Sequence, residues 1–281
     1  MNITNISNLP LLGVGMGYRD ELCENIFENT QYIDFLEITM DHFVTKNKNR
    51  KNFLVKLKSK FEIVAHGLNL SLGSASGINK KYLNEIKPIL KNTKPPWWSE
   101  HISFTTNGDI EIGHLSPLPF NKESLKVLSE NIKELKEEIK IPLILENITY
   151  TINLPWNKIE ESKYLGEVVY TTGCGLLLDI TNLFINSKNH SFDPIKFIDN
   201  LPENSIVQMH FVGAMEKDGT WVDTHSCKTQ KEIFDLIDYV LSKFNVKGII
   251  LERDSGFSDF KNLMDELSIV KEIWKKYNQW I

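Results

Sequence analysis

Histidine, carboxylate and asparagine side chains stand at or near the ends of most short apolar runs in this sequence. Imidazole nitrogens and carboxylate or amide oxygens are ligands for transition-metal ions. One ion takes about four to six ligands, so the set is large enough for two or three ions. With no thiolate in the pattern, nitrogen and oxygen ligation suits Fe, Mn or Zn. The candidate metal ligands are His66, His101, Glu146, Asp179, Asn182, His210, Asp223, His225 and Glu252.

The elements that must position these side chains are eight short apolar runs, which are typical of β-strands. Several of them are apolar almost throughout, as expected for parallel strands that are covered on both faces. The predicted strands are Leu11–Gly17, Ile33–Ile38, Glu62–His66, Glu100–Phe104, Pro142–Glu146, Leu176–Ile180, Ile206–Phe211 and Gly248–Glu252.

Longer amphipathic segments separate these runs. In Asn121–Lys140 the apolar residues recur at steps of three and four, which predicts a helix with one buried stripe. A second helix is predicted after Thr229, which forms a capping-box pattern with Glu232. A third is predicted over Phe260–Trp274. The segment around Pro88 is predicted to be a kinked or broken helix, because proline lacks the backbone donor.

The alternation of strands and helices favours a (β/α)8 TIM barrel. Eight units over 281 residues correspond to about 35 residues per unit, which suits one domain over residues 1–281. The alternative is an open, doubly wound parallel sheet. Gly13, Gly15 and Gly17 form a G-x-G-x-G pattern, but no strand is followed by the G-x-G-x-x-G turn of a dinucleotide-binding sheet. We therefore predict the closed barrel.

In such a barrel the carboxyl ends of the strands form one rim, where active sites lie. The candidate ligands are expected to meet there. A ring of buried carboxylates and imidazoles needs compensating charge, and Arg253 is the one strand-end cation nearby in the sequence. Metal ions supply such charge, and a carboxylate can bridge two of them. The pattern therefore predicts a metal site at the C-terminal rim.

The composition is that of an ordinary globular protein, with 41% hydrophobic and 25% charged residues. A net charge of −5 argues against general nucleic-acid binding, which needs a basic surface. No apolar run approaches the roughly 18 residues of a membrane span, and Met1–Pro10 lacks the pattern of a signal peptide. Cys23, Cys174 and Cys227 form no C-x-x-C pair, so we expect a cytoplasmic protein.

Two further features of the sequence have more than one interpretation. Trp97 and Trp98 precede the fourth predicted strand, and a place in the core is favoured over stacking on a bound peptide. His190 is interpreted either as a loop-packing residue or as a contact to the metal ligands or the substrate.

Several stretches resemble the multinuclear non-heme iron-dependent oxidative enzymes, the family of MbnB and TglH, and the resemblance covers essentially the whole chain. The most specific stretch is TGCGLLLDITNLFINSKNH at Thr172–His190. The others are HGLNLSLG at His66–Gly73, EHISFT at Glu100–Thr105, LSPLPF at Leu115–Phe120, LILEN at Leu143–Asn147, MHFVG at Met209–Gly213 and DTH at Asp223–His225. One departure is Thr181, which stands where many members have asparagine.

The resemblance implies a xylose-isomerase-like TIM barrel that holds two or three iron ions in a mixed Fe(II)/Fe(III) state. Glu146, Asp179 and His210 are the predicted catalytic residues. The implied ligand sets are Glu146, Asp179, His210 and Glu252 for one ion, His66, His101 and bridging Glu146 for the second, and Asn182, Asp223 and His225 for the third.

The resemblance also implies the reaction partners. O2 would be the cosubstrate, and a ribosomally synthesised precursor peptide would be the substrate. The residue to be modified is expected to be a cysteine, whose thiolate would bind Fe(III) before a hydrogen is removed from Cβ. A small leader-binding partner protein is implied as well, whereas no nucleic acid and no membrane are expected as partners.

Two other classes of protein fit parts of the same pattern. Endonuclease IV and the sugar isomerases are barrels with similar strand-end ligands for divalent metals. Asn182 stands where the nuclease pattern has histidine, and the net charge of −5 disfavours DNA repair. A sugar isomerase usually has a strand-end lysine for proton transfer, and none is evident here. A non-enzymatic metal store or scaffold is the remaining alternative.

Overall fold

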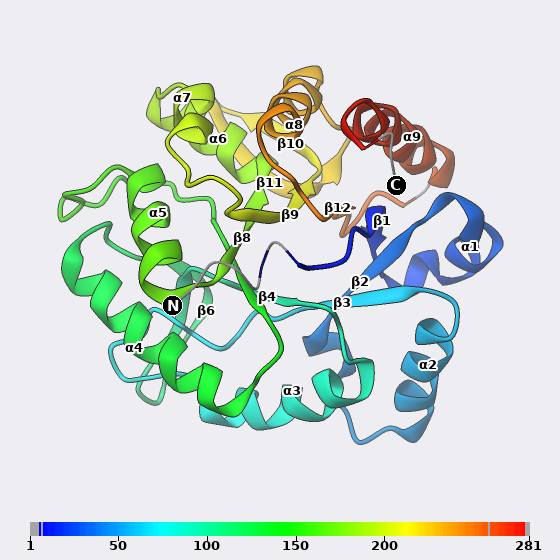
Figure 1. Ribbon diagram of the computed structural model, residues 1–281, viewed down its shortest axis with the longest axis horizontal. Helices are drawn as coiled ribbons and strands as arrows, with labels where there is room; N and C mark the ends of the chain where they lie inside the picture. The colour runs from blue at the N-terminus through cyan, green and yellow to red at the C-terminus, as the bar shows by residue number, and fades with distance from the viewer. Residues whose placement is uncertain (1–5, 7, 258, 279–281) are drawn as a thin grey trace.

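The computed structural model describes residue 6 and residues 8–257 and 259–278; residues 1–5 and 7, part of the Met1–Pro10 segment, lie outside this description. Eight parallel strands close into a barrel in the order β1-β12-β9-β8-β7-β4-β3-β2. Helices surround the barrel (Figure 1). The predicted (β/α)8 TIM barrel is confirmed, and the open doubly wound sheet is excluded.

The elements follow the expected alternation, with two additions. The barrel strands are β1 (Gly13–Gly17), β2 (Phe35–Thr39), β3 (Glu62–His66), β4 (Trp98–His101), β7 (Leu143–Glu146), β8 (Gly175–Asp179), β9 (Ile206–Phe211) and β12 (Gly248–Leu251). The additions are two antiparallel hairpins, β5 (Ser103–Asn107) with β6 (Ile110–Pro117), and β10 (Gly213–Lys217) with β11 (Thr220–Cys227).

The α-helices lie between these strands and after the last of them. They are α1 (Cys23–Glu28), α2 (Lys48–Lys58), α3 (Lys80–Thr93), α4 (Lys122–Glu138), α5 (Glu161–Thr172), α6 (Ile180–His190), α7 (Pro194–Asp199), α8 (Lys231–Lys243) and α9 (Phe260–Tyr277). Short 3-10 helices are η2 (Asp20–Leu22), η3 (Thr30–Tyr32) and η4 (Met40–Phe43).

The fourth barrel strand lies earlier in the chain than the predicted Glu100–Phe104. It runs over Trp98–His101, because the backbone N–H of Trp98 donates to the Pro142 carbonyl at 3.0 Å and pairing with β7 begins there. The chain leaves the barrel after Ile102, and Ser103 already belongs to the hairpin. The prediction was wrong because the hairpin continues the β pattern beyond the barrel.

Of the two outcomes predicted at Pro88, a broken helix is excluded, because helix α3 continues through it. Pro88 is exposed, where water can bond the freed carbonyl, and the opposite face of the helix is buried. The predicted cap of α8 was wrong. Thr229 does not cap α8, because its hydroxyl donates to Glu266 of α9. Helix α8 therefore begins at Lys231, after Gln230.

A small apolar cluster fills the barrel interior toward the amino ends of the strands. Most barrel strands contribute one inward-facing residue to this cluster. Leu9 and Leu12, from the segment before β1, pack against the cluster. That segment crosses the barrel in the view of Figure 1. The cluster consists of Ile6, Phe35, Val64, Trp97, Ile144, Leu177, Val207 and Ile250.

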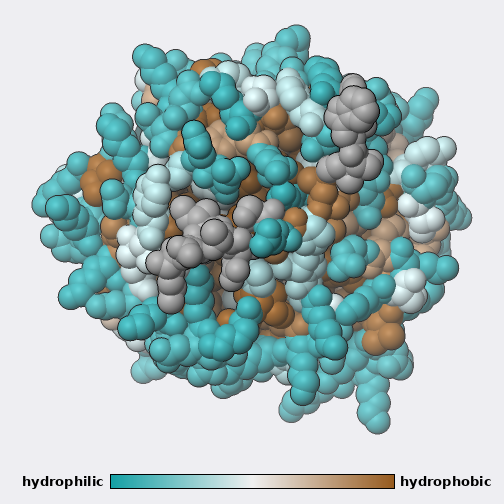
Figure 2. Space-filling model, in the orientation of Figure 1, coloured by the Kyte–Doolittle hydropathy of each residue, from teal (hydrophilic) through white to brown (hydrophobic). Residues whose placement is uncertain are grey.

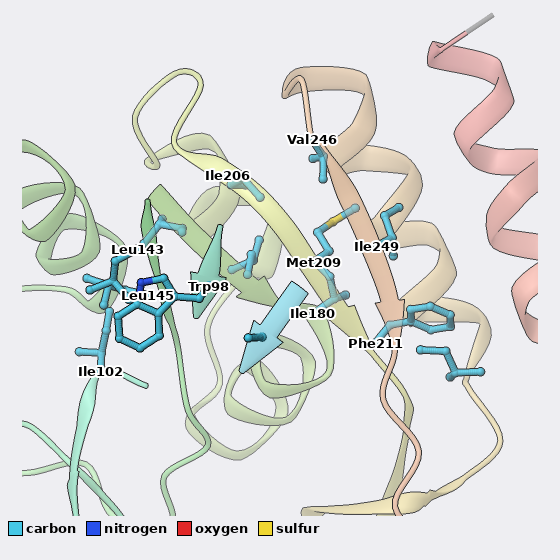
Figure 3. Close-up of a cluster of buried hydrophobic side chains, with 14 of the residues drawn as sticks. Trp98, Ile102, Leu143, Leu145, Ile180, Ile206, Met209, Phe211, Val246 and Ile249 are labelled. Carbon is cyan, nitrogen blue, oxygen red and sulfur yellow. The ribbon is translucent and has the colours of Figure 1, made fainter. Parts of the chain in front are cut away.

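The larger core lies between the outward faces of the strands and the helices. Figure 3 shows part of it, where Trp98, Leu145 and Phe211 lie among other apolar side chains from neighbouring strands. Both tryptophans are thus in the core as expected, but Trp97 points into the barrel and Trp98 lies outside it, within β4. Figure 2 shows that the outer edge of the face seen in Figure 1 is mostly hydrophilic.

The glycines of the first strand serve close packing. A Cβ on Gly15 would lie 2.1 Å from the backbone oxygen of Phe35, so only glycine fits at that position in β1. The G-x-G-x-G pattern therefore belongs to a strand and not to a phosphate-binding turn. No helix within the described residues is long and apolar enough to cross a bilayer.

Candidate metal centre

The barrel brings most of the candidate ligands to one rim. In their strands His66, His101, Glu146 and Asp179 each hold the last position, His210 is the last residue but one, and Glu252 directly follows β12. The parallel register places His101 beside Glu146, and Asp179 beside His210. All six residues are buried. Adjacent strands thus present their ligands at the same height.

Glu146 lies between three imidazoles. Its Oε2 is 3.4 Å from Nε2 of His66 and 3.3 Å from Nε2 of His101. Its other oxygen, Oε1, is 3.4 Å from Nδ1 of His210. The two carboxylate oxygens therefore face different imidazole groups, as expected for a carboxylate that bridges two ions.

A second group of ligand atoms shares Glu146. One atom from each of Glu146, Asp179, His210 and Glu252 lies within 4.8 Å of the others. In this group Oε2 of Glu252 is 3.0 Å from Nδ1 of His210. Asp179 also begins α6, because its Oδ1 accepts from the backbone N–H of Asn182 at 2.7 Å. That bond fixes one carboxylate oxygen and leaves Oδ2 for the group.

The third predicted set is brought together less tightly. Asp223 and His225 lie on β11, in the hairpin that follows β9, and Oδ2 of Asp223 is 2.7 Å from Nε2 of His225. Asn182 lines the same cavity. However, the compact group around His225 includes Glu252 and Asp254, with Nδ1 of His225 3.3 Å from Oδ2 of Asp254.

Two observations favour the Asp223 side of His225 for a third ion. Nε of Arg19 donates to Oδ1 of Asp254 at 2.6 Å, so an internal cation already offsets the Asp254 charge. By contrast Oδ1 of Asn182 is buried and has no hydrogen-bond partner among the described residues, while its Nδ2 donates to the Asn147 carbonyl. A buried acceptor in this state is costly unless a cation binds it.

The outward ring nitrogens of the three inner histidines face polar side chains. Nδ1 of His66 is 2.7 Å from Oγ of Ser99. Nε2 of His210 is 2.8 Å from Oε1 of Glu37. For His101 the outward partner is Glu100, at a longer 3.6 Å. In His66 and His210 one ring nitrogen faces the centre and the other is held from outside, which is how proteins orient histidine ligands to metals, whereas Nδ1 of His101 has no hydrogen-bond partner among the described residues.

The cation nearest the centre is not the one that the sequence indicated. Arg253 points away, with Nη1 bonded to the Ser226 carbonyl and Nη2 to Glu266. Arg19, the second residue after β1, lines the cavity and lies 3.4 Å from Glu252. Arg19 was missed because nothing near it in the sequence marks this position as part of the rim.

Most of the candidate ligands line a cavity of about 460 Å³, although Asp179 and His210 do not. Leu68, Leu115 and Ile148 form apolar parts of its wall, and Arg19 and His42 line it as well. The volume falls within the range of about 300–1,000 Å³ that is usual for small-ligand sites. It suits one or two residues of an extended chain and excludes a folded domain.

The carboxylates and imidazoles shift one another's pKa values strongly. Burial raises the pKa of Asp179 to about 8, helped by the charges of Glu146 and Asp223. For His101 burial alone would lower the pKa, but Glu146, Glu100 and Glu252 together outweigh burial and raise the pKa to about 9. In the absence of a metal ion, protons therefore neutralise part of the cluster.

The same competition sets the protonation of the neighbouring groups. Burial opposes the charged form of His210, yet Glu37, Glu252 and Glu146 raise its pKa well above 6.5. The pKa of Glu252 is held well below its usual value by His210 and His225, against the effect of burial. A metal ion would displace these protons and take over their role.

The distances and the unpartnered atoms fit metal ions. Ligands about 2.0–2.2 Å from one ion lie roughly 3.0–3.4 Å from each other, depending on octahedral or tetrahedral geometry. The inward contacts of Glu146 and Glu252 fall in this range, at 3.0–3.4 Å. Among the atoms described, Oε2 of Glu146 and Nδ1 of His210 are buried without a hydrogen-bond partner. The residues present therefore fit a centre with more than one ion.

Two residues from the Thr172–His190 stretch lie outside the ligand groups. Nε2 of His190 is 2.8 Å from the Tyr150 carbonyl, and the two rings stack with centroids 4.5 Å apart. His190 thus packs against the loop that follows β7. The hydroxyl of Thr181 donates to the carbonyl of Val212 and accepts from its backbone N–H. The threonine that stands here in place of asparagine therefore does not affect the ligand atoms.

Comparison with known protein families gives a match over nearly the whole chain. The profile of "RiPP precursor modification enzyme MbnB/TglH/ChrH" matches residues 13–275. A UPF0276 protein of Caulobacter vibrioides is 26% identical over 266 residues, covering 94% of this chain and 95% of that protein. A UPF0276 protein of Streptomyces avermitilis is 30% identical over 96% of this chain, which corresponds to 57% of that longer protein.

Solved structures with the same fold include sugar epimerases. D-psicose 3-epimerase from Clostridium cellulolyticum H10 has a TM-score of 0.61 at 12% identity, covering 94% of this chain and 99% of that one. L-ribulose 3-epimerase has a TM-score of 0.60 at 11% identity, with 95% of each chain covered. At this identity the likeness concerns the barrel fold alone.

Proposed function

Because the chain belongs to the MbnB/TglH/ChrH family of RiPP precursor modification enzymes, we propose that it is a multinuclear iron-dependent oxidase. Its proposed substrates are O2 and a ribosomally synthesised precursor peptide. The residue that it modifies is proposed to be a cysteine of that peptide.

The observation that carries this proposal is the contact of one buried carboxylate with three imidazoles. Oε2 of Glu146 faces His66 and His101, and Oε1 faces His210, at 3.3–3.4 Å. A site for a single ion needs no shared carboxylate of this kind. A carboxylate between two sets of neutral nitrogen ligands supports a centre in which two ions lie side by side.

Three sets of residues are proposed to hold two or three iron ions in a mixed Fe(II)/Fe(III) state. The bound iron would supply one-electron chemistry with O2 and a Lewis acid for a thiolate. The proposed sets are His66, His101 and Glu146; Glu146, Asp179, His210 and Glu252; and Asn182, Asp223 and His225. Glu146, Asp179 and His210 are the proposed catalytic residues, because they belong to the group of ligand atoms that shares Glu146 with the His66 and His101 group.

The chain's own residues would bind and orient the peptide and keep water away from the reacting groups. Leu68, Leu115 and Ile148 give the cavity an apolar wall, which favours entry of a short extended segment over bulk water. The rest of the precursor must be recognised outside a cavity of about 460 Å³. A small leader-binding partner protein is proposed for that task.

Metal analysis of the protein purified without oxygen tests the proposal. After expression with ample iron, we expect about two to three iron ions per chain and Mössbauer and EPR signals of both oxidation states. Oxygen uptake should then require a cysteine-containing precursor peptide. Full occupancy by zinc with no iron signal would contradict an iron oxidase. Iron binding without peptide-dependent oxygen uptake would favour a metal store.

A matched pair of variants tests the third set. D223N and D254N each remove one carboxylate charge beside His225. We expect D223N to lower the iron content by about one ion per chain and D254N to leave it unchanged, because Arg19 already offsets Asp254. The opposite result would place the third ion between His225, Glu252 and Asp254.

A sugar isomerase or epimerase is less well supported. The fold is shared with sugar epimerases, but the described residues that line the cavity include no lysine. The family match also lies with peptide modification and not with sugar chemistry.

A further inference from the structure

A carboxylate that belongs to none of the ligand groups lies directly beneath His210. Glu37 of β2 is 3% exposed and His210 is 0% exposed. Oε1 of Glu37 is 2.8 Å from Nε2 of His210, on the side of the ring that faces away from Glu146 and Glu252. An isolated carboxylate at this depth is costly, so its remaining oxygen must also be satisfied.

A fixed chain of hydrogen bonds holds that second oxygen. Oε2 of Glu37 accepts from Nε2 of Gln208 at 2.6 Å, and Oε1 of Gln208 accepts from the indole N–H of Trp97 at 2.7 Å. An indole N–H can only donate, so the oxygen of the Gln208 amide must face Trp97. The amide nitrogen of Gln208 therefore has to face Glu37. Trp97 thus sets the direction of every hydrogen bond in this series.

This series of hydrogen bonds determines which ring nitrogen carries the hydrogen when the His210 imidazole is neutral. A carboxylate only accepts, so the short contact of Glu37 places the hydrogen on Nε2. Nε2 of Gln208 lies 3.1 Å from the same ring nitrogen, which is a longer contact than the 2.8 Å to the Glu37 carboxylate, a group that cannot donate. When a metal ion displaces the proton from Nδ1, the lone pair of that nitrogen becomes free, 3.0 Å from Glu252 and 3.4 Å from Glu146.

We propose that Glu37, held by Gln208 and Trp97, is a positioning residue that makes Nδ1 of His210 the metal-binding nitrogen. Its negative charge also makes that nitrogen a stronger donor, as outer carboxylates do for histidine ligands. The inference rests on the metal centre of the proposed function, but it depends neither on iron nor on a peptide. The same hydrogen-bond chain would act on any ion that binds there.

Two adjacent tryptophans provide a matched pair for the test. Trp97 and Trp98 are both buried, and phenylalanine at either position removes an indole N–H. Trp97 donates to Gln208 inside the barrel, whereas Trp98 donates to the Ile141 carbonyl at 3.3 Å, outside it. A merely structural role of the tryptophans would give W97F and W98F the same effect on the metal centre.

The test measures the state of the ring itself. The protein is labelled with nitrogen-15 at histidine and loaded with Zn(II), a diamagnetic probe, and long-range proton–nitrogen spectra report which ring nitrogen carries hydrogen. The H210A variant identifies the signals of His210. We expect hydrogen on Nε2 and zinc on Nδ1 in the unaltered protein. Hydrogen on Nδ1 in the unaltered protein would overturn the proposal, whether or not the variants at Glu37 and Trp97 fold.

Zinc affinity, measured by competition with a chelator, gives the second readout. E37Q is expected to weaken binding about 10–100-fold, as is typical when the outer partner of a histidine ligand is lost, and to remove the single Nε2–H state. W97F should weaken binding several-fold, whereas W98F should leave it unchanged. Affinity and ring signals in E37Q equal to those of the unaltered protein would overturn the proposal. A protein that fails to take up iron or oxygen would refute the oxidase alone, since zinc binding would still report on Glu37.

Discussion

The two ends of the barrel interior are built from the same strands but in opposite ways. Toward the amino ends, Ile144 and its neighbours form a closed apolar cluster that needs no partner from outside. Two residues further along the same strand, Glu146 faces three imidazoles with a buried oxygen that no described hydrogen-bond donor satisfies. The first end is complete as folded, whereas the second end leaves buried polar atoms that metal ions would satisfy.

This difference separates stability from function within one strand. The apolar end gains free energy by removing side chains from water. The polar end costs free energy to bury, and protons shared between imidazoles and carboxylates offset only part of that cost. A substitution at the first end should therefore change the free energy of unfolding, and one at the second end should change metal binding.

The largest effect is expected for His210→Ala at the polar end. The variant should lose about one ion per chain and at least about 1,000-fold in peptide-dependent oxygen uptake, which corresponds to several kcal/mol of lost metal assistance. Its far-ultraviolet circular dichroism should stay unchanged, because one lost ligand is a local change. Metal content equal to that of the unaltered protein would remove His210 from the ligand set.

Ile144→Ala should show the reverse pattern at the apolar end. Ile144 is 1% exposed, and loss of its buried methyl groups should lower the free energy of unfolding by about 2–5 kcal/mol. Urea denaturation measures this change. Metal content at a temperature where the variant is folded should not change. A variant that keeps its stability but loses its metal would break the distinction between the two ends.

The polar end should make the metal-free protein sensitive to pH. His101 has a pKa raised to about 9 from 6.5. Its protonated ring therefore stabilises the fold fully below pH 6.5, and this contribution is lost as the pH rises toward 9. The loss is on the order of 3 kcal/mol. Denaturation curves of the chelator-treated protein should show it, whereas the metal-loaded protein should show no such fall over the same range.

The smallest effect is expected for Ser99→Ala. Oγ of Ser99 contacts Nδ1 of His66 at 2.7 Å, so the variant frees the outward side of one ligand without changing its inward side. Metal affinity should fall about tenfold, with little change in the free energy of unfolding. Equal affinity in chelator competition would show that packing alone orients His66.

The comparison also shows how far the sequence predicted the molecule. The strand-end positions of His66, Glu146 and Asp179 follow from the apolar runs, because a parallel strand covered on both faces has few polar positions and they fall at its ends. The ends of β4 and α8 were misplaced, since they depend on pairing with β7 and on the contact of Thr229 with Glu266.

The sequence by itself determined the barrel, its rim and the kinds of ligand gathered there, because periodicity and residue type are local properties of the chain. Only the tertiary structure decided how the ligands divide and what holds them. Glu37 and Gln208 meet beneath His210 although 171 residues separate them, and Arg19 reaches Asp254 across 235 residues. Such contacts arise from closure of the barrel, which brings its first and last strands together. The local sequence pattern does not indicate which distant residues this closure brings into contact.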